Sequence, residues 1–128
     1  MNYWVTESYK TFNRLIENNT YKYEKTLIKL FNKVSNTVEN LKDYKISDLK
    51  TDIILNYESL CLNIYDSNNV SYYIECFPYA SDDVFESCLL IEDKNTNEIL
   101  FAQTNTLNNN LYELKLKFSK QNYGTSYN

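Results

Sequence analysis

The side chains of this chain whose types and spacing could do chemistry are carboxylates followed two residues later by a lysine. This Glu-x-Lys pattern occurs at Glu92 and Lys94 and again at Glu113 and Lys115. An acidic pair starts at Asp82, about ten residues before the first pattern. In nucleases of the restriction type, two carboxylates hold Mg²⁺ beside the scissile phosphate, and a lysine orients water or stabilises charge. A strand would place Glu113 and Lys115 on one face, as that chemistry requires. A magnesium-dependent nuclease is therefore one hypothesis.

The distribution of charge argues against a nuclease. Between residues 51 and 110 the chain carries ten acids and a single base, Lys94. A field of this sign repels nucleic acid and anionic membranes. Glu-x-Lys is also short enough to arise by chance, and the strand expected to carry Glu113 is the last one, with no helix after it. We therefore expect a solvated strand face and a protein that is not an enzyme.

Other catalytic and cofactor-binding classes lack the residues they need. The chain has no histidine, which removes the commonest general base and most catalytic zinc sites. A single glycine excludes glycine-rich phosphate loops. The three cysteines, Cys61, Cys76 and Cys88, are fifteen and twelve residues apart, a spacing that matches no zinc knuckle. We expect no metal and no cofactor.

The cellular compartment is predicted from the cysteines and the apolar runs. The odd number of cysteines, with no close pair, favours reduced thiols in a cytoplasm. The longest apolar stretches, residues 88–91 and 99–102, fall far short of the roughly 20 residues that a membrane-spanning helix needs. The first residues lack the basic and apolar regions of a signal peptide. We expect a cytoplasmic protein.

The first third of the chain has the apolar spacing of two helices. Val5, Tyr9, Phe12 and Ile16 are spaced by four, three and four residues, with Thr6 as a candidate N-cap. The second helix, ending near residue 42, has a longer apolar stripe made by Tyr23, Leu27, Leu30, Phe31, Val34, Val38 and Leu41. Lysines lie off this stripe, so the helix is expected to turn its apolar side to a core and a basic side to solvent.

From about residue 51 the apolar residues recur with period two. This alternation predicts strands over residues 60–65, 70–77, 84–91, 99–104 and 112–118, joined by short polar turns. Pro78 is expected to end the second of these strands. Residues 53–57 are ambiguous, because Leu49, Ile53 and Tyr57 also have the spacing of a short helix.

Together these patterns predict one α+β domain over residues 1–128. Two N-terminal helices, within residues 6–42, are expected to pack on an antiparallel β-meander of about five strands, within residues 51–119. The tail over residues 121–128 is expected to be frayed.

The acidic middle of the chain suggests a protein partner. Carboxylates flanked by tyrosines could dock into a basic cleft whose usual occupant is a phosphate backbone, with tyrosine adding contact area. Small, acidic, histidine-free proteins from AT-rich mobile elements such as phages often inhibit nucleases or neutralise toxins. Anti-CRISPR and immunity proteins share this general character, as an analogy of class alone. We therefore expect an inhibitor of a basic nucleic-acid-handling protein or nuclease, working as a monomer or homodimer. The candidate partner-binding residues are Asp82, Asp83, Glu86, Glu92, Asp93 and Tyr79.

Two other interpretations stay open at this stage. The acidic surface could serve only to keep the protein soluble. The chain could self-associate, through the stripe of the second helix or an open sheet edge. Direct binding of nucleic acid is disfavoured, because tyrosines such as Tyr65, Tyr72 and Tyr73 lie among acids rather than lysines.

Overall fold

A computed structural model describes residues 10, 12–14, 17, 24–41, 50–56, 59–66 and 68–122, with backbone only at 24, 50–56, 79–81 and 120–122. The chain has an α+β fold, as predicted. The element order is α2 (Glu24–Asn40), β1 (Lys50–Asn56), β2 (Ser59–Tyr65), β3 (Val70–Ser81), β4 (Val84–Asp93), β5 (Glu98–Thr106) and α3 (Leu107–Asn122). The strands form one antiparallel meander in the order β1-β2-β3-β4-β5.

The second predicted helix is confirmed as α2. Its stripe recurs every three or four residues, and Leu27, Leu30, Phe31, Val34, Val38 and Leu41 are all buried. Because the core uses this stripe, it is not free to form a coiled coil between chains. Of the first predicted helix, residue 10, residues 12–14 and residue 17 have helical backbone. Phe12 stacks on Phe31 with ring centroids 4.2 Å apart. The rest of that helix lies outside the described residues. Of the tail predicted to be frayed, residues 121–122 belong to helix α3, and residues 123–128 lie outside the described residues.

Four of the predicted strands are confirmed as β2, β3, β4 and β5. The ambiguous residues 53–56 belong to a strand, since β1 pairs with β2 and sets Ile53 opposite Leu62. The expectation that Pro78 ends β3 is wrong, because the strand continues to Ser81. The register between β3 and β4 shifts between Cys76 and Ala80, and a proline without an N–H is tolerated where ladder bonds are interrupted.

The predicted last strand, residues 112–118, is wrong, because these residues lie in helix α3. Leu107, Leu111, Leu114 and Phe118 are spaced by four, three and four residues, and all are buried. That spacing is the helical period, so one side of the helix covers the sheet. Thr106 caps the first turn, since its Oγ1 accepts a hydrogen bond of 3.3 Å from the Asn109 N–H. The helices are therefore N-terminal and C-terminal to the meander rather than N-terminal alone.

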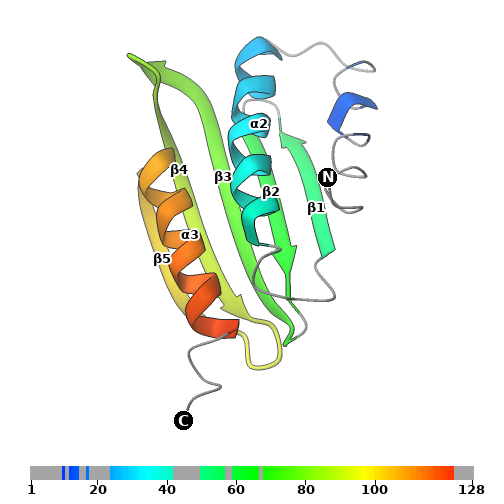
Figure 1. Ribbon diagram of the computed structural model, residues 1–128, viewed down its shortest axis with the longest axis vertical. Helices are drawn as coiled ribbons and strands as arrows, with labels where there is room; N and C mark the ends of the chain where they lie inside the picture. Colours follow the sequence, from blue (N-terminus) through cyan, green and yellow to red (C-terminus); the bar gives the residue numbers. More distant parts are fainter. Residues whose placement is uncertain are drawn as a thin grey trace.

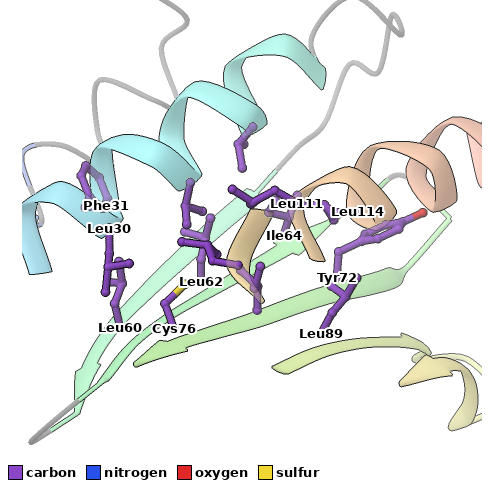
Figure 2. Close-up of a cluster of buried hydrophobic side chains, with 14 of the residues drawn as sticks. Leu30, Phe31, Leu60, Leu62, Ile64, Tyr72, Cys76, Leu89, Leu111 and Leu114 are labelled. Atoms are coloured by element: carbon purple, nitrogen blue, oxygen red, sulfur yellow. The ribbon is translucent and has the colours of Figure 1, made fainter. Parts of the chain in front are cut away.

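Both helices pack on the same face of the sheet (Figure 1). Helix α2 contacts β2 and β3, while α3 contacts β4 and β5. The core lies between the two layers, and Figure 2 shows Leu30 and Phe31 of α2 and Leu111 and Leu114 of α3 above the strand residues. Tyr72 packs on Phe118 with ring centroids 5.0 Å apart. None of the described helices is long and apolar enough to cross a membrane.

Candidate functional site

The candidate site is the sheet face that points away from α2 and α3. Alternation along the paired strands assigns side chains to the two faces, and the core side chains identify the face under the helices. No helix among the described residues covers the opposite face, which we call the outer face. Its residues with described side chains include Ser59, Cys61, Asn63 and Tyr65 of β2, Ser71, Tyr73 and Glu75 of β3, Glu86, Cys88, Leu90 and Glu92 of β4, and Ala102, Thr104 and Thr106 of β5. The register also sets Lys50, Asp52 and Ile54 of β1 on this face.

Acids and bases are segregated between the two layers. The strands β2 to β5 contain five acids and no lysine or arginine, and three of the acids, Glu75, Glu86 and Glu92, lie on the outer face. Helices α2 and α3 together contain six lysines against three glutamates. Separation of this kind gives one side of a molecule a field of a single sign. The outer face is thus the negative side of the described fold.

The structure divides the predicted partner-binding acids between the two ends of β4. Glu86 is exposed on the outer face near the start of the strand. Glu92 is half-buried near the end of the strand and forms an ion pair of 2.7 Å with Lys94. Asp93 supports the following turn, because its Oδ1 accepts a hydrogen bond from the Asn95 N–H. Glu86 and Glu92 are six residue steps apart along the strand, or roughly 20 Å. These acids therefore do not form one cluster.

Asp82 and Asp83 make the turn between β3 and β4. Both have left-handed backbone, with φ of 57° and 61°, as a two-residue hairpin turn requires. The Asp83 carboxylate accepts a hydrogen bond of 2.9 Å from the Lys29 Nζ of α2. This ammonium holds the pKa of the Asp83 carboxyl below its usual value. Of the predicted residues, Tyr79 lies in β3, in the stretch where the register with β4 shifts.

A hydrogen-bonded cluster around Glu75 occupies the middle of the outer face. Ser59 Oγ donates to Glu75 Oε2 at 2.7 Å, and Cys61 Sγ donates to the same oxygen at 3.4 Å. The Tyr73 hydroxyl lies 3.1 Å from the Cys61 sulfur. Sequence reasoning missed this cluster. Alternation along each strand indicates on which face residues 61 and 75 lie. Only the register between β2 and β3 sets Cys61 opposite Glu75.

Cys61, Cys76 and Tyr73 are held in their protonated forms. Burial raises the pKa of the Cys61 thiol, and the Glu75 carboxylate raises it further. Burial also raises the pKa of Cys76 and Tyr73 far above their usual values. A thiolate, not a thiol, is the nucleophile in cysteine chemistry. At neutral pH the Cys61 thiol of this cluster is therefore a hydrogen-bond donor to Glu75 rather than an activated nucleophile, and both Ser59 and Cys61 are buried.

These raised pKa values predict that the protein loses stability in alkali. A group whose pKa is higher in the folded protein than in the unfolded chain stabilises the fold below its unfolded pKa and ceases to do so as pH rises. For Cys61 and Cys76 that loss begins near pH 9, the ordinary value of the thiol. We expect the free energy of unfolding, measured in urea, to fall between pH 8 and pH 10.5. Cys76→Ala should make the fall shallower, and a flat profile would contradict the prediction.

The nuclease hypothesis loses its geometric basis. Glu113 and Lys115 lie on α3, where residues two apart point in different directions, instead of on one strand face. Glu113 lies 3.8 Å from Lys117, and Lys94 pairs with Glu92. Within the part of the chain that the structure describes, no three cysteine or carboxylate side chains are grouped so that they could hold a metal ion.

Comparison with known proteins returned no matching family model, no matching curated protein and no matching solved structure. The outer face has therefore to be interpreted from its own residues.

Proposed function

We propose that this domain is a non-enzymatic binding protein whose outer face docks on a basic partner. The observation that supports it most directly is the segregation of charge, with carboxylates and no lysine or arginine in β2 to β5 and six lysines in the two helices. A cation-rich surface is steered toward the sheet side and away from the helix side. The partner is thus expected to contact the sheet.

The composition of the outer face supports a protein as the partner. Between Glu86 and Glu92, β4 presents Cys88 and Leu90, and Tyr73 lies opposite Leu90 on β3. An apolar and aromatic centre with charged residues at its margins is the usual arrangement of a protein interface. The centre would supply contact area, and the two glutamates would supply complementary charge.

A basic nucleic-acid-handling protein is the partner class that we propose. Its cleft normally binds a line of phosphates, which carry about one negative charge per 3.4 Å along each strand of a duplex. The distance from Glu86 to Glu92 along β4, roughly 20 Å, matches about six such steps. An inhibitor of this kind occupies the cleft and excludes the nucleic acid.

The test is capture of a basic partner followed by measurement of that partner's nucleic-acid binding. Tagged protein is incubated with a nuclease-treated lysate of a low-GC bacterium, and retained proteins are eluted with rising salt. We expect a basic protein that is released at high salt and that loses its nucleic-acid binding when the tagged protein is added in equal amount. Glu86→Lys combined with Glu92→Lys should weaken the binding about a hundredfold or more, since like charges then face the partner.

The matched control changes the net charge by the same amount away from the outer face. Glu17→Lys combined with Glu113→Lys alters residues that lie outside the strands and should leave the binding within about threefold. Asp82→Asn with Asp83→Asn removes the charge of the hairpin turn while keeping residues that tolerate left-handed backbone. Equal loss in the control and the outer-face variants would show that net charge alone acts, and would reject a specific docking face.

A further inference from the structure

Strand β5, at one edge of the sheet, lacks the residues that usually prevent an edge strand from pairing with another chain. β5 is the last strand in the sheet order, so among the described residues it pairs with β4 on one side only. An edge strand presents a row of N–H and C=O groups that can pair with another chain, and soluble proteins usually guard such edges with lysine or proline. β5 contains neither, and Glu98 at its start is its single charged residue. Its apolar residues Ile99 and Leu100 are 61% and 37% exposed.

The part of β5 that can accept a new strand is its second half. Ile91 pairs with Phe101 while Glu92 pairs with Ile99, so Leu100 is an extra residue that bulges from β5. A bulge interrupts regular pairing at this point. From Phe101 to Thr106 the pairing with β4 is continuous, and these six residues carry no charge. The opposite edge differs, since β1 begins at Lys50 and also contains Asp52.

We propose that two copies of this chain associate through β5, pairing antiparallel about a two-fold axis near Gln103, so that the two sheets become one. A two-fold axis brings the same strand segment against itself, and any charge there would face its own copy. The uncharged stretch from Phe101 to Thr106 avoids that repulsion. This association is independent of the outer-face function.

Helix α3 is compatible with the same two-fold contact. Its Lys117 Nζ lies 4.7 Å from the centroid of the Phe101 ring, and Asn110 Oδ1 accepts a hydrogen bond of 2.9 Å from Gln103 Nε2. This side of α3 therefore lies over β5, and it carries the ion pair between Glu113 and Lys117, with 3.8 Å between the charged atoms. When two copies meet across the axis, the helices present mixed charges to each other rather than charges of one sign.

The test is the mass of the full chain in solution over a range of concentrations. Sedimentation or light scattering between about 5 and 500 µM should show conversion of the 15.3 kDa chain to a species of twice that mass. Thr104→Pro removes an N–H from the edge, and Ala102→Lys places a charge on it. Each should raise the dissociation constant of the dimer about tenfold or more. The control Thr96→Lys adds the same charge in the exposed turn between β4 and β5 and should leave it unchanged.

Amide hydrogen exchange keeps the test decisive if a variant folds poorly. In the unaltered chain, the amides of residues 101–106 should exchange more slowly as the concentration rises, while those of the β3–β4 turn should not change. A chain that stays monomeric across the range would overturn the proposal, as would a dimer unaffected by both β5 variants. Glu86→Lys with Glu92→Lys should leave the dimer intact, so failure of the outer-face function and failure of this association are separate results.

Discussion

Leu114→Ala is expected to lower the free energy of unfolding by about 3 kcal/mol, whereas Leu116→Ala should lower it by less than about 0.5 kcal/mol. Both changes remove the same atoms from the same helix, two residues apart. The Leu114 side chain is fully buried between α3 and the sheet, while Leu116 is 46% exposed. Burial alone makes the difference, because a cavity forms only where the lost atoms were packed.

This pair of variants also distinguishes helix from strand in the last part of the chain. In a strand, Leu114 and Leu116 would share a face and be buried or exposed together. In α3 they point in different directions. Urea unfolding of both variants, followed by circular dichroism, provides the measurement. Similar losses for the two would contradict the helix and restore the strand that the alternation predicts.

Asp66→Ala is expected to destabilise the protein by about 4 kcal/mol. The Asp66 carboxylate is buried in the turn between β2 and β3. Its Oδ1 accepts hydrogen bonds from the Asn68 N–H at 2.8 Å and the Val70 N–H at 3.0 Å, and its Oδ2 accepts one from the Tyr72 hydroxyl at 3.1 Å. Alanine leaves these donors without their acceptor, two of them in buried surroundings, and each such loss costs about 1–3 kcal/mol.

The corresponding turn between β4 and β5 provides the control. Asp93 Oδ1 accepts a single hydrogen bond of 2.9 Å, from the exposed Asn95 N–H, and water can replace that acceptor. Asp93→Ala should therefore cost less than about 1 kcal/mol. Chemical denaturation of the two variants tests the difference, and near-equal losses would show that the buried bonds of Asp66 do not stabilise the hairpin.

Much of the architecture could be predicted because local patterns and the final fold agree. The stripe that contains Leu30 and Val34 has the spacing of an amphipathic helix, and helix α2 follows from it. The alternation from Leu60 to Ile64 and from Val70 to Cys76 likewise identifies the hairpin of β2 and β3, with the turn at residues 66–69. In each of these segments one side of the helix or strand is buried, and the period of the apolar residues alone indicates which side.

Residues 107–122 show where a local pattern is not sufficient. Leu114 and Phe118 fit a period of two with Tyr112, and they also fit a helical period with Leu107 and Leu111. Packing decides between them, because a helix buries Leu114 and Phe118 against the sheet and leaves Tyr112, 62% exposed, in solvent. A further strand would have left that part of the sheet without a cover.

At the candidate site, amino-acid composition sets the charge, whereas the pairing of the strands sets how the charged residues are arranged. The acidity of residues 51–110 is a property of composition and needs no coordinates. That Glu86 and Glu92 lie at opposite ends of one strand, and that Glu75 lies opposite Cys61, depends on which strands pair and in which register. Register is set by packing of the buried face as a whole and not by the outer residues themselves. The sequence could therefore predict an acidic surface, while only the fold could assign it to one face of the sheet.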